Sequence, residues 1–342
     1  MIPTRNIYYM LAYAFQSLQA REYAACGSEA FDNTAGLLAA ILAKGVSQQV
    51  KRGLQHGYIS QTEQLSAPRG KIDLAASLKR KSLLKRQLVC QRDEFLPDTR
   101  LNQILKSTMQ ALLKADIAAR QKSELRVLLV YFQTVRFVPA YRIHWHERFD
   151  RSSRTYEALV FICYLVLKGL LPDAQSGQQK MQLFLDEQRA SHLYEKFILG
   201  YYQREHPELH PASSFIRWNL GGAPAGLLPV MHSDVMLRAA DTGRTLILDA
   251  KYYAHMTQTR FDVHTLHSHN LYQIFTYVKN QDVAHTGKVS GMLLYARTDE
   301  EIVPDSDFCI DGNPIHVKAL DLNQPFEAIA AQLEAFVEPL KM

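Results

Sequence analysis

The chain has 342 residues, of which 47% are hydrophobic and 21% are charged, and its formal net charge at pH 7 is +5. These values exclude a disordered chain and allow two ordinary domains, each long enough to bury its own core. The mild positive charge is compatible with nucleic acid binding but does not by itself indicate it. The four cysteines form no Cys-x-x-Cys pair, which argues against a zinc ribbon or a disulfide framework and favours the reducing cytoplasm.

The first half of the chain is predicted to be mainly helical, because apolar residues recur at helical spacing along most of it. The expected helices cover about 4–20, 30–56, 99–118, 122–134 and 154–170, with shorter strand or loop pieces around 58–73 and 87–95. The longest apolar run, Ala158–Leu167, is too short to span a bilayer, so no membrane association is expected. A polar stretch with proline and glycine, Leu171–Lys180, predicts a boundary between domains 1–175 and 176–342.

A basic cluster, Lys79–Arg86, lies in the first half and follows a predicted exposed loop at Arg69-Gly70-Lys71. The cluster is either a solvated helix face, which is the ordinary role of a charge run, or a contact with a DNA backbone or an acidic partner surface. The chain has no P-loop: Ile72 follows Gly70-Lys71 and Val289 follows Gly287-Lys288, where a hydroxyl residue should bind magnesium.

The second half of the chain alternates helices and strands. The predicted order is a helix at 188–204, a hairpin of strands 234–240 and 245–251, a helix at 268–280, strands at 291–295 and 315–320, and a helix at 324–339. This order predicts a mixed sheet flanked by helices, so the fold class is mixed α/β.

The hairpin carries the most informative residues. With a turn at 241–244, Val235 is expected to pair with Ala250 and Leu237 with Leu248, which makes one face apolar. The other face then carries Asp234 across from Lys251, with Asp249 on the diagonal. Two carboxylates and a lysine in this order suit a metal-dependent phosphodiesterase, although Asp-x-Lys also occurs by chance as a surface ion pair. A carboxylate at the end of an apolar strand is costly to bury unless a partner compensates its charge, and a bound metal ion would do so.

Several motifs resemble known families when they are taken in order. The set Glu195, Asp234, Asp249-Ala250-Lys251 and Gln273-x-x-x-Tyr277 resembles the PD-(D/E)XK nuclease superfamily, and its last element resembles the RecB-like branch. Further segments resemble the McrC subunit of methylcytosine-dependent, GTP-driven restriction systems: Ile2–Leu11, Asn102-x-x-Leu105-Lys106-Ser107-Thr108, Asp249–Tyr253 and His269–Gln273. The resemblance runs from residue 2 to the last helix and so covers essentially the whole chain. Pro229 departs from the superfamily pattern because it is not adjacent to Asp234.

The resemblance implies roles for the hairpin residues. Asp234 and Asp249 become ligands of Mg²⁺, and Lys251 becomes the catalytic lysine that orients the attacking water or stabilises phosphoryl charge. The carbonyl of Ala250 is implied as a further metal ligand. Glu195 is implied as another, at a position where the family does not always have an acid.

The helix after the hairpin is expected to position the site. The resemblance implies that Gln273 and Tyr277 are catalytic positioning residues, and their spacing places both on one face of the helix. The ordinary alternatives are a helix-to-loop hydrogen bond for Gln273 and core packing for Tyr277. The implied architecture is a mainly helical α+β adaptor domain, 1–175, followed by a restriction-endonuclease-like PD-(D/E)XK domain, 176–342.

The function that the resemblance implies is that of the endonuclease subunit of a type IV, modification-dependent restriction complex. A separate McrB-like AAA+ GTPase would bind GTP and read methylated DNA, and the adaptor domain would dock on it and stimulate GTP hydrolysis. Double-strand cleavage needs two sites, so a second copy of this chain is expected in the active complex. Two alternatives remain: a non-cutting adaptor that only activates the GTPase, and a stand-alone Mg²⁺-dependent DNA nuclease.

Overall fold

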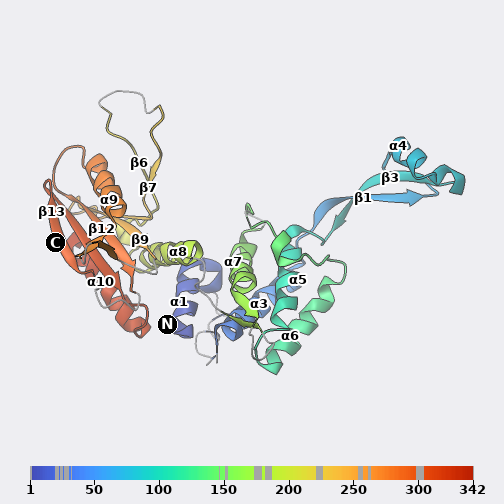
Figure 1. Ribbon diagram of the computed structural model, residues 1–342, viewed down its shortest axis with the longest axis horizontal. Helices are drawn as coiled ribbons and strands as arrows, with labels where there is room; N and C mark the ends of the chain where they lie inside the picture. The colour runs from blue at the N-terminus through green and yellow to red at the C-terminus, as the bar shows by residue number, and fades with distance from the viewer. Residues whose placement is uncertain are drawn as a thin grey trace. The chain divides into compact units, whose positions relative to one another are not determined.

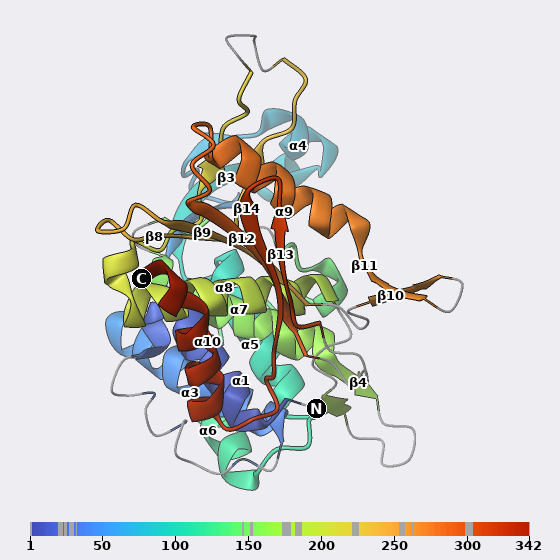
Figure 2. The same cartoon turned by 90° about the vertical axis from the view of Figure 1, so that its left-hand side faces the viewer.

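The computed structural model describes residues 2–19, 23, 26, 31, 33–145, 147–150, 153–172, 179–181, 187–220, 226–252, 257–260, 263–297 and 304–341. The chain divides into two units, which we describe separately. We call Phe31–Leu183 the helical unit, and Met1–Ala30 together with Phe184–Met342 the sheet unit. Figures 1 and 2 show their elements in chain colours.

The helical unit is built from four longer helices: α3 (Thr34–Arg52), α5 (Arg100–Leu112), α6 (Ala119–Leu129) and α7 (Arg154–Gly169). All four confirm helices predicted from the sequence. Side-chain caps set where two of them begin, since Asn33 Oδ1 accepts from the N–H of Gly36 at 2.8 Å and Thr99 Oγ1 accepts from Asn102 at 3.4 Å. The short elements of this unit are η3 (Val130–Phe132), η4 (Ala140–Arg142), β4 (Leu170–Pro172) and β5 (Gln179–Met181).

A long antiparallel hairpin extends from these helices (Figure 1). Its strands, β1 (Gly57–Leu65) and β3 (Leu88–Leu96), pair along their whole length, and β2 (Lys71–Ile72) pairs with β3. Asn102 of α5, which is fully buried, ties the two ends of the hairpin to the helices. Its Nδ2 donates to the carbonyls of Gln55 at 2.8 Å and Pro97 at 2.7 Å, and its Oδ1 accepts from Tyr156 of α7 at 3.0 Å. This network gives a structural reason for the Asn102 motif.

One of the two interpretations of the basic cluster was a solvated helix face, but its residues do not lie on a single helix. It begins on the short helix α4 (Leu74–Lys79) and continues through η2 (Ser82–Lys85). Lys81 and Arg86 adopt left-handed backbone conformations, with φ of 52° and 55°, and these interrupt the helix on both sides of η2. The basic side chains are exposed around a compact turn between β2 and β3.

The sheet unit contains a five-stranded mixed sheet in the order β13-β14-β12-β9-β8. The strands are β8 (Val235–Arg238), β9 (Thr245–Lys251), β12 (Val289–Ala296), β13 (Ser306–Ile310) and β14 (Asn313–Leu320). The central strands β9, β12 and β14 are parallel, while the edge strands β8 and β13 run antiparallel to their neighbours. This confirms the mixed α/β class; the exposed edge strand β13, which lacks a buried face, was not predicted.

Helices cover both faces of the sheet (Figure 2). They are α8 (Glu187–Glu205), α9 (Ser268–Gln281) and α10 (Phe326–Lys341), close to the predicted ranges. Ile247 of β9 packs with Ile274 and Val278 of α9, so alternate residues of β9 face that helix. The neighbouring Leu246 faces α10 on the opposite side, where it lines a cavity with Phe336. Smaller elements are η1 (Gln16–Gln19), η5 (Pro207–Leu209), β6 (Phe215–Ile216), β7 (Met231–His232), β10 (Thr257–Arg260) and β11 (Val263–Leu266).

The register of the β8–β9 hairpin differs from the predicted one by two residues. Val235 pairs with Leu248 and Leu237 with Leu246, instead of with Ala250 and Leu248. Because side chains alternate with a period of two, the shift leaves every residue on its predicted face. The predicted apolar face is therefore present, but the predicted cross-strand neighbours are wrong.

The turn explains the shift. Gly243 adopts a φ of +67°, which favours glycine, and its N–H donates to the carbonyl of Ala239 at 3.0 Å. Arg244 lies outside the turn and pairs with Ala239, since its carbonyl accepts from the N–H of Ala239 at 2.9 Å. The loop is therefore 240–243 and not 241–244, and each strand is displaced by one residue.

The N-terminal helix α1 (Thr4–Ala14) belongs to the sheet unit, unlike in the predicted division into 1–175 and 176–342. It is attached there by specific contacts, because the buried Asn6 Nδ2 donates to the carbonyls of Leu322 at 2.8 Å and Gln324 at 2.7 Å. Tyr9 also stacks on Phe326 with ring centroids 4.2 Å apart. Among the helices that the structure describes, none has the length and apolar character required to cross a membrane.

A glycine allows α1 to approach α8. A Cβ added to Gly200 would lie 2.0 Å from the carbonyl oxygen of Tyr13, so the two backbones are in contact. We expect Gly200→Val to lower the free energy of unfolding of the sheet unit by about 3 kcal/mol, because α1 must move away. Chemical denaturation followed by tyrosine fluorescence measures this.

The matched control is Gly36→Ala in α3, another helical glycine. An added Cβ there would meet its nearest neighbours at 3.5 Å or more, which is ordinary contact, so this variant should be at least as stable as the parent. Equal stabilities for Gly200→Val and the parent would contradict the seating of α1 on α8.

Candidate active site

The two predicted metal-binding aspartates come together at the start of β8. Asp234 directly precedes this strand, and the observed register, in which 235 faces 248, places residue 234 opposite residue 249. Asp234 Oδ2 accepts from the backbone N–H of Ala250 at 2.8 Å. The side chain of Asp249 is only 2% exposed, whereas Asp234 is partly buried. The shift of register therefore brings the acids closer than the diagonal arrangement expected from the sequence.

A serine pair, Ser213-Ser214, which sequence patterns did not single out, holds the residue before Asp234. The buried Ser233 donates its N–H to the carbonyl of Ser214 at 3.0 Å, and the hydroxyl of Ser213 donates to the carbonyl of Ser233 at 2.8 Å. A backbone bridge between Ala212 and Met236 continues the contact on the other side of Asp234. These bonds fix the backbone on both sides of the aspartate. The only signal in the sequence was two adjacent small polar residues.

Lys251 lies at the end of β9, beside Asp249. Its Nζ is 2.7 Å from Asp249 Oδ2, and its side chain is 15% exposed, so the ion pair is largely removed from water. Nζ also donates to Gln273 Oε1 at 3.2 Å, and Gln273 Nε2 donates to the hydroxyl of Tyr277 at 2.8 Å. Gln273 therefore bonds from α9 to the lysine on the strand end. The ring of Tyr277 packs in the core, as its ordinary interpretation predicts, and its hydroxyl accepts from Gln273. The positioning roles of Gln273 and Tyr277 stay predictions.

Glu195 of α8 lies near the aspartates but is held by its own helix. Its carboxylate accepts from the hydroxyl of Ser191 at 3.0 Å and lies 3.8 Å from Nδ1 of His192. Its negative charge contributes to raising the pKa of both Asp234 and Asp249. Within the described residues, no three His, Cys, Asp or Glu side chains stand ready as a metal-ligand cluster. The role of Glu195 as a metal ligand stays a prediction, as does that of the Ala250 carbonyl.

The aspartate pair resists ionisation. Burial raises the pKa of Asp234 to about 8, and the charges of Asp249 and Glu195 act in the same direction, against the Ala250 N–H and Lys251. Burial also raises the pKa of Asp249, although Lys251 opposes the change. Asp234 and Asp249 thus share the positive charge of Lys251, with the negative charge of Glu195 nearby. A hard divalent cation would relieve this excess, and carboxylate oxygens are the ligands that Mg²⁺ prefers, so the residues present fit the expected cofactor.

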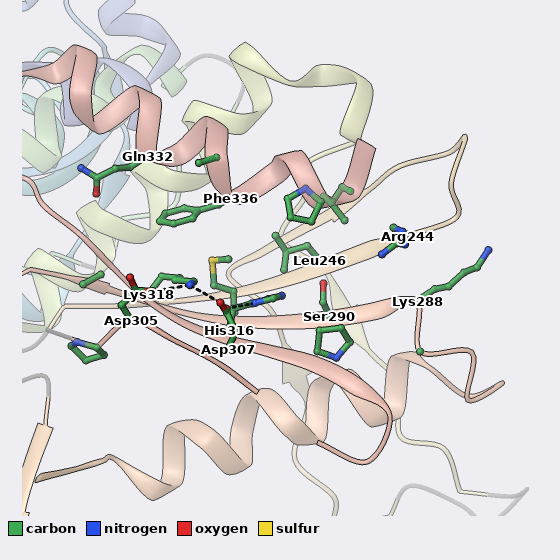
Figure 3. Close-up of a pocket in the computed structure, with 18 residues that line it drawn as sticks. Arg244, Leu246, Lys288, Ser290, Asp305, Asp307, His316, Lys318, Gln332 and Phe336 are labelled. Carbon is green, nitrogen blue, oxygen red and sulfur yellow. Dashed lines mark hydrogen bonds and ion pairs between the residues drawn. The ribbon is translucent and has the colours of Figure 1, made fainter. Parts of the chain in front are cut away.

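The opposite face of the sheet has a separate cavity of about 560 Å³, between α10 and the strands (Figure 3). Four of its polar residues pair with one another: Lys318 Nζ lies 2.7 Å from Asp305 and 3.0 Å from Asp307, and His316 Nδ1 lies 2.6 Å from Asp307. The cavity contains none of the predicted site residues. The predicted site residues lie instead on the face covered by α9.

Comparisons with known proteins show which family the chain belongs to. A family model described as the McrBC 5-methylcytosine restriction system component matches residues 4–296. A curated relative, the type IV methyl-directed restriction enzyme EcoKMcrBC of Escherichia coli (strain K12), is 29% identical over 350 residues, which cover 100% of this chain and 99% of that protein.

Two solved structures are also similar. One is a refined half-complex from a tetradecameric assembly of Thermococcus gammatolerans McrB AAA+ hexamers with bound McrC, with a TM-score of 0.46 and 16% identity over 98% of this chain and 76% of that chain. The other is the McrBC complex of Thermococcus gammatolerans, with a TM-score of 0.40 and 16% identity over 59% of this chain and 58% of that chain. Because the family model spans most of its length, this chain belongs to the McrBC 5-methylcytosine restriction system component family.

Proposed function

We propose that this chain is the Mg²⁺-dependent endonuclease subunit of a type IV restriction complex and hydrolyses DNA phosphodiester bonds. One observation carries the proposal: Asp234, Asp249 and Lys251 converge at one end of the sheet. The family supplies the biological setting, since its relative EcoKMcrBC is a methyl-directed restriction enzyme.

The two aspartates would hold the metal. Asp234 and Asp249 present carboxylate oxygens on the α9 side of the sheet, with the Ala250 carbonyl and Glu195 as candidate additional ligands. Bound Mg²⁺ would polarise the phosphate and lower the pKa of a water molecule. The N–H of Ala250 and the serine pair keep Asp234 in place, so the backbone need not reorganise when the metal binds.

Lys251 would act on the reacting groups. Asp249 Oδ2 and Gln273 Oε1 hold its ammonium in a fixed position with little exposure to water. From there it would orient the attacking water or stabilise charge on the phosphoryl oxygens, and it does so without rearrangement because α9 already holds it. Gln273 and Tyr277 act through Lys251 and are positioning residues.

The helical unit would dock on an McrB-like AAA+ GTPase. A partner must bind GTP because this chain has no P-loop. The tip of the β1–β3 hairpin offers a docking surface, since it combines the exposed basic cluster with the exposed side chains of Leu74, Leu78 and Leu84. We propose that this contact stimulates GTP hydrolysis, that the partner recognises methylated DNA, and that two copies of this chain cut the two strands.

Plasmid cleavage tests the proposal. Methylated and unmethylated plasmids are incubated with this chain and Mg²⁺, alone and with the GTPase encoded beside its gene plus GTP. We expect cleavage only of methylated DNA, only with partner and GTP, and none when Mg²⁺ is chelated. Asp249→Ala serves as the site control and should abolish cleavage.

The other outcomes identify the alternative functions. Cleavage by the chain alone with Mg²⁺ would indicate a stand-alone nuclease. A partner whose GTPase is stimulated while no DNA is cut would indicate a non-cutting adaptor. Cleavage by Asp249→Ala at the parent's rate would show that the active site has been assigned wrongly.

A further inference from the structure

A two-stranded ribbon leads directly into the aspartate site. In this ribbon, β6 and β7 are antiparallel, with Phe215 opposite His232 and Ile216 opposite Met231. Two residues beyond the strands, the indole N–H of Trp218 donates to the carbonyl of Pro229, the residue that the same register would place opposite it, at 2.7 Å. The ribbon ends at β7, two residues before Asp234.

The inner face of the ribbon is fixed to the helix that supports the catalytic lysine. Ile216 and Met231 are buried in the core that contains Tyr277 of α9. The N–H of Asn219 donates to Asn280 Oδ1, one turn further along α9, at 2.8 Å. The ribbon is therefore held against the same helix, and on the same side of the sheet, as the predicted site.

The outer face is both apolar and cationic. Phe215 is 74% exposed and Val230 is 76% exposed. Arg217 is exposed as well, and the exposed ring of His232 lies 4.7 Å from that of Phe215. The sequence from residue 209 to residue 233 contains no aspartate or glutamate. Large exposed apolar side chains around an arginine, with no acid among them, indicate a surface that binds an anionic partner.

We propose that the outer face of this ribbon binds the DNA duplex beside the scissile phosphate. Arg217 would pair with a backbone phosphate, while Phe215 and Val230 would pack into the groove. A two-stranded ribbon has the dimensions that the major groove admits, and ribbons bind DNA in this way in other folds. This inference rests on the proposed function, because it assigns the substrate contact of the same site. DNA is favoured over a protein partner by the absence of acids and by the continuity of the ribbon with Asp234.

Duplex binding by the full chain without its GTPase tests the ribbon, because the partner is itself proposed to recognise methylated DNA. The protein is titrated into a fluorescent methylated duplex at several salt concentrations, in buffer that contains Ca²⁺ in place of Mg²⁺. We expect Arg217→Gln to weaken binding about fivefold and to lower the slope of log affinity against log salt by about one, as loss of one phosphate contact predicts. Phe215→Ser with Val230→Ser should weaken binding about tenfold with an unchanged slope.

Two kinds of control separate a specific effect of the ribbon from a general effect of substitution. Arg244→Gln and Phe308→Ser remove an exposed arginine and an exposed phenylalanine elsewhere on the sheet unit and should bind like the parent. Arg217→Lys keeps the charge and should restore the salt slope, which a folding defect would not do.

The result that overturns the inference is parental DNA affinity in the ribbon variants. Loss of self-association in sedimentation, with DNA affinity retained, would also overturn it and would indicate an interface between copies. Cleavage by Asp249→Ala is measured separately, with the GTPase and GTP added. If that variant is inactive while the ribbon variants bind normally, the ribbon inference fails and the proposed function stands; if it is active, the proposed function fails independently.

Discussion

Replacement of Asp234 by asparagine is expected to abolish DNA cleavage without unfolding the protein. The amide keeps an oxygen that can accept from the N–H of Ala250, which Asp234 Oδ2 now accepts at 2.8 Å, so the local backbone is retained. It removes a charged metal ligand, and we expect a loss of at least about 1000-fold in cleavage rate, or about 4 kcal/mol of transition-state stabilisation. Single-turnover cleavage of methylated plasmid by the assembled complex measures this loss.

The stability of the same variant provides a second measurement. Burial raises the folded-state pKa of Asp234 from 3.8 to about 8, so the folded protein binds a proton more tightly than the unfolded chain. The parent therefore loses stability as pH rises from about 4 towards about 8, because the folded state resists losing that proton. Asp234→Asn has no such cost. In a chelating buffer, its thermal midpoint should exceed that of the parent by a margin that grows between pH 5 and pH 8.

Added Mg²⁺ should reverse this order, because it stabilises the parent through the aspartates and has less effect on the variant. Stimulation of the partner's GTPase should be unchanged, since we place that function in the helical unit. A variant that cuts DNA at the parent's rate would contradict the assignment of Asp234. Parallel stability curves across pH would contradict the burial of its charge.

The hairpin shows what the sequence could predict about the site and what it could not. Alternation of apolar residues fixed the faces, and a shift of two residues left Asp234 and Asp249 on the same face. The register itself depended on which residue closed the turn, and only the positive φ of Gly243 settles that. Faces are set by the burial of many side chains, whereas a turn depends on one backbone conformation.

Contacts between residues far apart in the sequence could not be predicted from local sequence patterns. The helical spacing of apolar residues in α1 predicts a helix, but it does not show that Asn6 donates to carbonyls more than 300 residues away. The serine pair that holds Asp234 lies on a segment with few strand signals. In contrast, the spacing of Gln273 and Tyr277 correctly placed both on one helix face, although the bond to Lys251 required the packing of α9 on the sheet.

Substitutions along the chain of contacts from Lys251 should have graded effects. Lys251→Gln removes the charge that would act on the phosphoryl group, and we expect cleavage to slow about 300-fold. Gln273→Ala leaves the lysine paired with Asp249 but removes its second contact, which should cost about tenfold. Tyr277→Phe keeps the packed ring and removes only the hydroxyl bonded to Gln273, so about a twofold loss is expected. Single-turnover rates at saturating Mg²⁺ measure all three.

The order of these effects distinguishes a positioning role from a direct one. If Gln273 acts only through Lys251, then adding Gln273→Ala to Lys251→Gln should slow cleavage little further, because the group that it positions is already gone. A double variant that loses the product of the two single effects would instead place Gln273 in contact with the substrate. His316→Ala, in the cavity on the opposite face of the sheet, is the matched control and should leave the rate unchanged. An equal loss in Lys251→Gln and His316→Ala would mean that cleavage responds to the stability of the sheet unit and not to the lysine.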